Sequence, residues 1–403
     1  MKPYFKFELS QFITNKKNIA IYVILLFLAC FYALNIAPSY KPIERVDAKE
    51  IEARYTSRES FIQNYLNDPN RFQGMASGGL FIFPRWNELD KKRLESLNEG
   101  NLKKYASVTS KWYTFSNDLI TSTGQYYYSP GYYTHGNLYA SDDGNYGYSY
   151  SASRYAGYGE GKSKLSINVF EERTALQTLQ RLLESYLPMI LIICCVFLSV
   201  DIVLKDRLYP SLLKGFPISD WKKLLIKGAV ALIGSVGIII PISIGLIMIG
   251  IRYGFGDFGL PVAIYTFVGE PTYFKKGEFL NTSMGMYLLQ NFIILILLFA
   301  LIISLVLLAS MIIRNEFANL LVGAMFIFNE IFYFKRGIGF FEEVENYPTN
   351  YVQVGQIISG YRNYIYNSSA LTFDKGVYVL GISTGILILL IFVISKFKRY
   401  KLV

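Results

Sequence analysis

The chain has 403 residues and a formal net charge of +10; 52% of its residues are hydrophobic and 17% are charged. Soluble domains carry about 25% charged residues, so this composition excludes an ordinary soluble enzyme or binding domain and predicts a membrane protein. In such a protein the basic surplus records which loops stay in the cytoplasm, and it gives no reason to expect nucleic-acid binding.

The first 18 residues predict a helix that lies in the membrane interface. Phe5, Leu9 and Phe12 recur at helical spacing among lysines, so one face is apolar and the rest is basic. A long apolar run follows at once, and no A-x-A site precedes Pro38. We therefore expect this run to remain as the first membrane span and not to be cleaved as a signal peptide.

Six apolar segments are close to or above the length that crosses a membrane. A hydrocarbon core of about 30 Å requires about 20 helical residues. The segments are residues 19–37, 186–204, 228–251, 287–313, 319–334 and 376–395. We therefore predict an all-α polytopic membrane protein with six transmembrane helices.

Lysine and arginine decide the predicted orientation because they resist translocation. With both termini inside, the cytoplasmic pieces carry a net charge of +11, and since the whole chain carries +10, the remainder nets −1. These pieces are residues 1–18, 205–227, 314–318 and 396–403. We expect a multi-pass protein of a bacterial cytoplasmic membrane, with both termini cytoplasmic.

Residues 38–185 are predicted to form a large extracellular domain of mixed α/β structure. Residues 43–67 and 87–113 favour helices, the second interrupted at Gly100, and the apolar stretch before residue 87 favours a turn and a strand. Residues 171–187 favour a helix that runs straight into the second span.

A Tyr/Gly-rich segment, residues 123–161, contains eleven tyrosines and eight glycines. The alternation of Tyr146, Tyr148 and Tyr150 favours a strand with one aromatic face, and the glycines favour hairpins or loops. Two interpretations fit this composition: an aromatic surface that binds a peptide, glycan or lipid headgroup, or a low-complexity loop that tolerates exposure.

The sequence contains no convincing catalytic, metal or cofactor site. Residues 156–163, AGYGEGKS, resemble a phosphate-binding loop but lack the apolar strand before it and the helix after it. His135 is the only histidine, which removes histidine-based metal clusters and Ser-His-Asp triads. Cys30, Cys194 and Cys195 all fall in predicted spans and are interpreted as packing residues. We expect no enzymatic activity, cofactor or metal in this chain.

Residues 201–227 join the second and third predicted spans and are rich in charged and aromatic residues. Residues 209–215 can form a short helical turn, Ser219 or Asp220 can cap the next helix, and Trp221 with two lysines can anchor it at the interface. Two interpretations fit: a rigid element on which a soluble motor domain pushes, or an ordinary positively charged loop.

The order of these features resembles the permease subunit of an ABC-2 type ABC transporter. The resemblance rests on Glu8 in the interfacial helix, the turn Pro217-Ile218-Ser219, and Lys227 about ten residues later. It covers residues 1–37 and 186–403. The family commonly has a Glu followed by Gly-Thr before the turn, whereas this chain has only Asp201 and Asp206 near that place.

The resemblance implies a dimer with a second permease, identical or homologous, and two separate ATP-binding subunits that would supply the ATP and Mg²⁺ chemistry. It implies ATPase-coupling residues in two cytoplasmic segments: Asp206, Arg207, Tyr209, Leu212, Lys214, Phe216, Arg314 and Glu316. It also implies a translocation path between permeases, with Phe326, Asn329 and Glu330 as candidates, and residues 335–375 are expected to form an outer re-entrant segment.

The function expected from the sequence is export of an amphipathic or lipid-like substrate, such as an antimicrobial peptide, from the membrane of a Gram-positive bacterium. The substrate could instead be a small ion or a drug. An alternative of another class is a non-transporting membrane receptor or scaffold, which would bind its ligand through the Tyr-rich outside domain.

Overall fold

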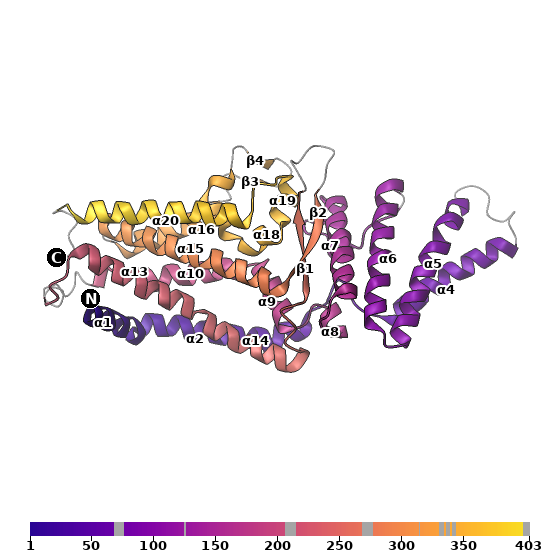
Figure 1. Ribbon diagram of the computed structural model, residues 1–403, viewed down its shortest axis with the longest axis horizontal. Coiled ribbons are helices and arrows are strands. Elements are labelled where there is room, and N and C mark those ends of the chain that lie inside the picture. Colours follow the sequence, from indigo (N-terminus) through magenta and orange to yellow (C-terminus); the bar gives the residue numbers. More distant parts are fainter. Residues whose placement is uncertain are drawn as a thin grey trace.

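The computed structural model describes residues 1–67, 76–124, 126–205, 215–267, 277–313, 315–329, 334–335, 339–340 and 344–397. The molecule is elongated (Figure 1), and 76% of its described residues are helical. One part is a bundle of long apolar helices, and the other is a stack of helices formed by residues 40–170, here called the helical domain (Figure 1). The start of the chain and the last turn of the final helix lie at the same end of the bundle, the end away from the helical domain, here called the basic end (Figure 1).

Four helices of the described chain are long and apolar enough to cross a membrane. They are Lys16–Ser39 (α2 Lys16–Phe31, η1 Tyr32–Ile36 and α3 Ala37–Ser39), Asp220–Tyr253 (α13 Asp220–Gly237 and α14 Ile239–Tyr253), α15 Met284–Ile312 and α20 Phe373–Ser395. The fifth predicted span is represented by α16 Glu316–Phe328, which has 13 residues and is too short to qualify alone. The described residues thus support four spans, or five when a bent pair is included.

The bent pair contradicts the prediction that the helix over residues 171–187 runs straight into the second span. The stretch Ile167–Leu183, which ends with α9 Ala175–Leu183, is followed by α10 Leu187–Ser199, and the axis turns by 68° between the two. Pro188 stands in the first turn of α10, where proline favours the start of a new helix because it has no N–H to donate to a preceding turn. α10 is therefore the apolar membrane segment, and α9 lies before the bend.

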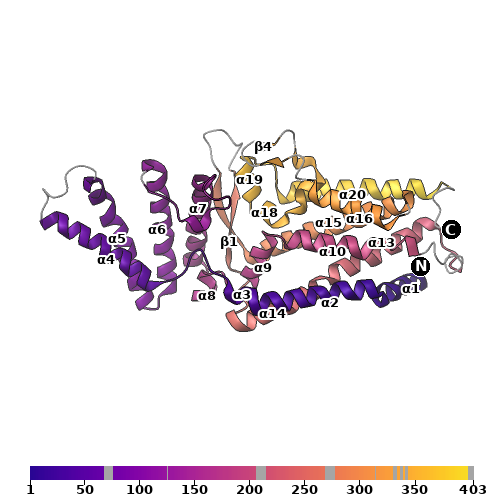
Figure 2. The same cartoon turned by 180° about the vertical axis from the view of Figure 1, so that it is seen from behind.

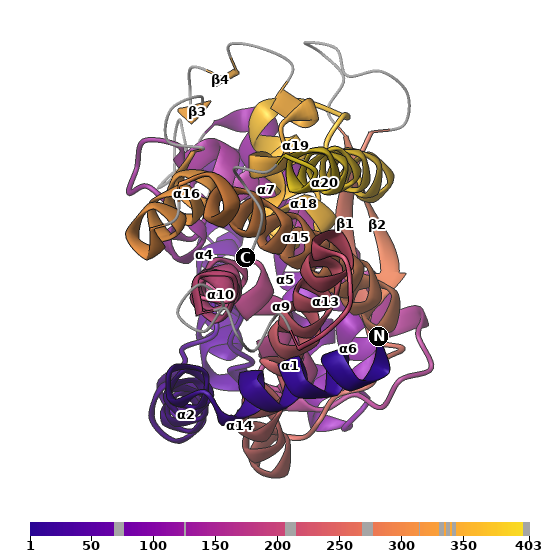
Figure 3. The same cartoon turned by 90° about the vertical axis from the view of Figure 1, so that its left-hand side faces the viewer.

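α15 is the central helix of the bundle. In its most apolar stretch 61% of the residues are buried, against 11% in the first span. It packs against α20, α10, α13 and α16, which surround it when the molecule is viewed from the basic end (Figure 3). The exposed apolar side chains of α2 and α20 are those expected to face lipid.

The helical domain contains no strand among its described residues beyond one isolated bridge, so the predicted mixed α/β structure is wrong. Its elements are α4 Ala48–Asn67, α5 Ala76–Asn98, α6 Leu102–Thr123, η3 Pro130–Tyr132, α7 Ala140–Glu160 and α8 Ile167–Phe170. The break at Gly100 is confirmed, with a φ of 67° between α5 and α6. The strand expected before residue 87 is instead the first part of α5, which contains Pro84.

The Tyr/Gly-rich segment is mainly helical, because α7 covers Ala140–Glu160. Tyr146 and Tyr150 are four residues apart, so their rings stack on one helix face at 6.3 Å. Tyr148 points to another face and meets Tyr113 of α6 with ring centroids 5.3 Å apart. The prediction of a strand was wrong: these tyrosines lie on two faces of a helix and pack against different neighbours.

Two glycines of α7 allow aromatic rings to pack directly against its backbone, which stabilises this glycine-rich helix. A Cβ at Gly144 would lie 2.2 Å from the Tyr128 ring, and one at Gly147 would lie 2.1 Å from the Tyr132 ring. The rings of the preceding segment thus occupy the places where side chains of α7 would stand. The lost helix propensity is offset by the packing of two aromatic rings, Tyr128 buried and Tyr132 half-buried.

A β-hairpin connects the bundle to the helical domain. β1 Pro261–Thr266 pairs antiparallel with β2 Glu278–Ser283, with Pro261 opposite Ser283. The amide of Asn281 donates to the carbonyl of Ser153 in α7 at 2.8 Å. This contact fixes α7 on the hairpin that joins α14 to α15.

The segment between α16 and α20 contains short elements. They are β3 Phe334–Lys335, β4 Gly339–Phe340, η4 Val344–Asn346, η5 Pro348–Val352, α18 Val354–Ile358 and α19 Tyr361–Tyr366. Tyr351, Val354 and Ile357 are buried against the bundle. Re-entry of residues 335–375 into the membrane stays a prediction.

Candidate functional site

The helix at the start of the chain, α1 Lys2–Thr14, lies across the basic end of the bundle (Figure 3). Asn15 ends it in an extended conformation and starts α2 by accepting a hydrogen bond from the backbone N–H of Lys17 at 3.1 Å. The buried face of α1 is formed by Tyr4, Glu8 and Phe12, four residues apart. A carboxylate therefore stands in the middle of its packed face.

Glu8 forms a buried ion pair with Lys227 of α13. The carboxylate Oε1 and the ammonium Nζ are 2.7 Å apart, and the two side chains are 5% and 1% exposed. The ring of Tyr4, which is fully buried, lies 6.0 Å from the ammonium. Such a pair is expensive to bury, so its geometry must be held closely by α1 and α13.

A second charged cluster joins the end of α10 to the start of α2. Asp201 accepts from the ammonium groups of Lys17 and Lys205, each at 2.6 Å. The side-chain amide of Asn15 donates to the same carboxylate at 3.3 Å. Both clusters involve residues from the N-terminal 17 positions, so α1 and the first turn of α2 are tied to two membrane helices.

These contacts fix both sides of the predicted coupling segment. Lys205 precedes it and is bound through Asp201, and Phe216, itself a predicted coupling residue, stands at its other end. The Phe216 ring packs against Tyr4 and Phe7 of α1, with centroids 5.0 and 5.4 Å apart. Five predicted coupling residues lie outside the described residues: Asp206, Arg207, Tyr209, Leu212 and Lys214.

The second predicted contact is partly described. Arg314 lies outside the described residues, whereas Glu316 is the exposed first residue of α16, with a charge close enough to act on Lys17. Asn315 caps this helix by accepting from the N–H of Phe317 at 2.8 Å. The structure therefore brings Glu316 to the same end of the bundle as Phe216.

Asn319 is a site residue that the sequence analysis missed. It is fully buried and donates to the carbonyl of Val200 at 2.9 Å and to the hydroxyl of Ser310 at 2.6 Å. It thus joins α16 to both α10 and α15. The signal that could have revealed it is a single polar side chain three positions into an apolar helix.

The predicted path residues are only partly placed. Phe326 is half-buried in α16, and Asn329 donates to the Thr349 hydroxyl at 3.4 Å. Glu330 lies outside the described residues. Within this chain α16 packs on α10, since a Cβ at Gly323 would lie 2.7 Å from Val196. A path between permeases stays a prediction.

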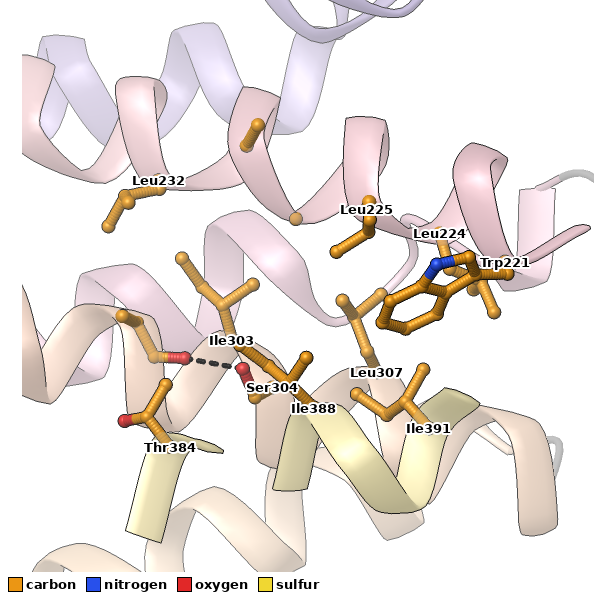
Figure 4. A pocket seen from close by; sticks show the side chains of 13 residues that line it. Trp221, Leu224, Leu225, Leu232, Ile303, Ser304, Leu307, Thr384, Ile388 and Ile391 are labelled. Atoms are coloured by element: carbon orange, nitrogen blue, oxygen red, sulfur yellow. Dashed lines mark hydrogen bonds between the residues drawn. The ribbon is translucent and has the colours of Figure 1, made fainter. Parts of the chain in front are cut away.

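A crevice of about 160 Å³ lies between α13, α15 and α20 and is lined by apolar side chains (Figure 4). Trp221 stands at one end of it, with its ring 5.0 Å from that of Phe392. The hydroxyls of Ser304 and Thr384 donate to carbonyls of their own helices, at 2.8 and 2.7 Å. Since both polar groups are already satisfied, this crevice has the character of a packing gap.

A larger cavity of about 610 Å³, here called the outer cavity, lies where the bundle meets the helical domain. Its wall includes Glu44, Tyr146 and Tyr150 of the helical domain, Glu184 at the bend before α10, and Arg362 of α19. Burial raises the pKa of Glu184 to about 7. α7 and α19, which help to line this cavity, lie at the opposite end of the bundle from α1, which carries Glu8 (Figure 1).

Neither a nucleotide loop nor a metal site is found among the described residues. Residues 156–160, the first part of the glycine-rich AGYGEGKS stretch, belong to the last turns of α7, so no strand–loop–helix arrangement is formed there. No three His, Cys, Asp or Glu side chains of the described chain come together as metal ligands. Comparison with protein-family models, with curated proteins and with solved structures finds no match.

Proposed function

We propose that this chain is the permease subunit of an ATP-driven exporter of the ABC-2 type, which moves an amphipathic or lipid-like substrate, such as an antimicrobial peptide, out of the cytoplasmic membrane. The observation that carries the proposal is the attachment of the first 17 residues, which form α1 and the first turn of α2, to both sides of the segment 206–214. The Asp201 cluster holds the preceding side, and the Tyr4–Phe216 contact holds the following side.

This arrangement suits the transmission of force. A displacement of residues 206–214 would act on α10 through Lys205 and on α13 through Phe216, while α1 would keep the two helices in register by its ion pair with Lys227. Packed elements transmit strain because protein interiors have low compressibility. In the proposed complex, two partner ATPases bind ATP and Mg²⁺, and a second permease completes the path.

The test is affinity purification of the full-length chain in mild detergent, with mass spectrometry and an ATPase assay on the complex. We expect a soluble ATPase to co-purify, and we expect Asp201→Lys to lower the ATPase activity of the complex. The matched control is Glu52→Lys, at an exposed position of α4. The proposal fails if no ATPase co-purifies in several detergents, or if the Asp201 variant and the control have equal activity.

The outer cavity favours a second candidate, a receptor or scaffold that binds a ligand without transport. A cavity of about 610 Å³ is large enough for a small ligand. A receptor would bind its ligand with no ATPase partner and would be insensitive to Asp201→Lys. The purification experiment therefore separates the two functions.

A further inference from the structure

The outer cavity has more negative than positive charge in its wall. Among the described residues that line it, five are carboxylates and one, Arg362, is a cation. The lining carboxylates are Glu44, Asp143, Glu171, Glu172 and Glu184. A cavity with this balance favours a positively charged ligand.

Four of these carboxylates already have strong partners. Glu44 and Glu172 bind the buried guanidinium of Arg154, the former at 2.6 Å, and Glu171 binds Arg173 at 2.7 Å. Asp143 accepts from the backbone N–H and the hydroxyl of a neighbouring threonine, at 2.8 and 2.7 Å. These groups are committed to the fold of the wall.

Glu184 differs from the other four. It accepts hydrogen bonds from the hydroxyl of Tyr287 at 3.0 Å and from the amide of Gln180 at 3.1 Å, both on the same carboxylate oxygen. None of the ion pairs formed by the described residues includes it. Its second oxygen is thus left for a cationic ligand, which would offset the cost of burying the charge.

Tyrosine rings supply a second feature that suits a cation. Tyr132, Tyr146 and Tyr150 line the cavity beside the carboxylates. An amine or guanidinium within about 6 Å of such a ring is attracted by its electron-rich face. The ring of Tyr150 already lies 5.4 Å from the guanidinium of Arg154 in the wall.

A second hollow, an apolar groove of about 460 Å³, is lined by residues of α2, α9, α10 and α14. Figure 2 shows these helices at the part of the bundle nearest the helical domain. Leu28 of α2 and Ile190 of α10 line the groove and are 48% and 40% exposed, so the groove opens toward the expected bilayer. Tyr186 lines both hollows. Tyr186, at the 68° bend before α10, therefore has the outer cavity on one side and the membrane-facing groove on the other.

The rim of the groove carries one cation, Arg181. Its guanidinium lies 3.5 Å from the centre of the Tyr40 ring and donates to the hydroxyl of Thr178. A cationic head group is therefore repelled by Arg181 at the rim. It is attracted only beyond Tyr186, where the carboxylates of the outer cavity lie. The charges along the groove and the outer cavity therefore favour one orientation of a cationic amphiphile, with its apolar tail in the groove and its charged head group next to Glu184.

We propose that the outer cavity and the adjoining groove form one binding site for a cationic amphiphile, whose amine or guanidinium lies against Glu184 and the tyrosine rings and whose apolar part lies in the groove. The ligand would enter from the bilayer. That this amphiphile is the exported substrate rests on the proposed function. That it binds to this site does not depend on that function.

The test is equilibrium binding of radiolabelled dodecylamine to the full-length chain in phosphatidylcholine nanodiscs, with binding to empty nanodiscs subtracted. We expect one saturable site. Dodecanol, which has the same chain without the charge, and propylamine, which has the charge without the chain, should each compete at least about tenfold more weakly.

Three variants place the site. Glu184→Gln keeps an acceptor for Tyr287 and should weaken dodecylamine binding at least about tenfold, because a charge-assisted hydrogen bond is lost. Tyr186→Ala should also weaken binding, and since this side chain is 74% exposed its removal leaves the packing intact. Glu52→Gln on α4, an exposed carboxylate outside the site, should bind as the unaltered chain does.

The inference is overturned if dodecanol competes as well as dodecylamine, or if Glu184→Gln and Tyr186→Ala both bind as the control does. The outcome is independent of the purification experiment. If dodecylamine binds but no ATPase co-purifies, the exporter function is rejected and the binding site is supported. If an ATPase co-purifies but dodecylamine does not bind, the exporter function is supported and the binding site is rejected.

Discussion

At the scale of single residues, the molecule is defined by ionisable groups at unusual depth. Glu8 and Lys227 are almost completely buried at one end of the bundle, and Glu184 lies between neutral donors at the other. Each position is costly unless the charge is compensated. Their energetic roles can therefore be separated by substitution.

Glu8→Gln should lower the stability of the protein by about 3–5 kcal/mol, because it leaves the ammonium of Lys227 buried without its counter-charge. The measurement is the midpoint of thermal unfolding in detergent. The double variant Glu8→Leu with Lys227→Met should recover most of the loss, since both charges are removed. As a control, Lys104→Gln breaks an exposed pair with Glu99 and should cost about 0–1 kcal/mol. Equal midpoints for Glu8→Gln and this control would contradict the prediction.

The stability of the protein should depend on Glu184 between pH 4.5 and 7. Its pKa is about 7 in the folded state and 4.5 as its ordinary value, so the folded protein holds this proton more tightly. The contribution is fully present below pH 4.5 and is lost as the pH rises through 7, by roughly 3 kcal/mol. Unfolding midpoints of the unaltered chain and Glu184→Gln, measured from pH 4.5 to 8, should diverge with pH in favour of the variant. A constant difference would refute the assignment.

At the scale of elements, glycines decide how closely neighbouring helices approach. Gly228 of α13 faces Leu307, which also borders the crevice between α13, α15 and α20. Gly323 of α16 faces Val196 of α10 at distances that allow no added atom. Two glycines in apolar helices thus have opposite tolerance for a methyl group.

Gly228→Ala should raise stability by about 1 kcal/mol, because alanine favours the helix and Leu307 can move into the crevice. Gly323→Ala should lower stability by about 1–3 kcal/mol, because its Cβ would lie 2.7 Å from Val196 and would force α16 away from α10. Thermal unfolding of the two variants in the same detergent compares them directly. A loss of stability in both would show that the crevice does not accommodate Leu307.

At the scale of the whole molecule, the chain separates a basic end from a helical domain, and this division should match the two sides of the membrane. In a variant without Cys30, Cys194 and Cys195, a cysteine at the exposed position of Glu52 should react with a membrane-impermeant maleimide in intact cells. A cysteine at the exposed position of Lys6 in α1 should react only after permeabilisation. The opposite pattern would invert the predicted orientation.

Four of the six predicted spans coincide with long apolar helices of the described chain, because their signal is composition over about 20 residues. The second and fifth predicted spans are shown only as one half of a bent pair and as a helix of 13 residues. The sequence predicts the helical domain poorly. Tyr146, Tyr148 and Tyr150 alternate as in a strand, yet the helix is decided by rings of a neighbouring segment that fill the places beside Gly144 and Gly147. A pattern of residue types within one segment does not show which side chains from other segments will pack against it.

The same limit applies to the candidate site. Glu8 and Lys227 were singled out by resemblance, but their mutual contact follows only from the packing of α1 across the bundle. Asp201 was noted as part of a charge cluster, and its binding to Lys17 joins parts of the chain 184 residues apart. Asn319 had no sequence partner to suggest its role.

The pairing of Glu8 with Lys227 also sets an order of events during synthesis. The two residues are 219 positions apart, and a ribosome that adds 5–20 residues per second needs about 10–40 s to travel between them. During that time α1 exists without its partner, and its carboxylate must be held by water and lipid head groups at the membrane surface. The first helix to be made therefore cannot reach its final place until Lys227, near the start of α13, has been made, and α15, α16 and α20 are still to follow at that point.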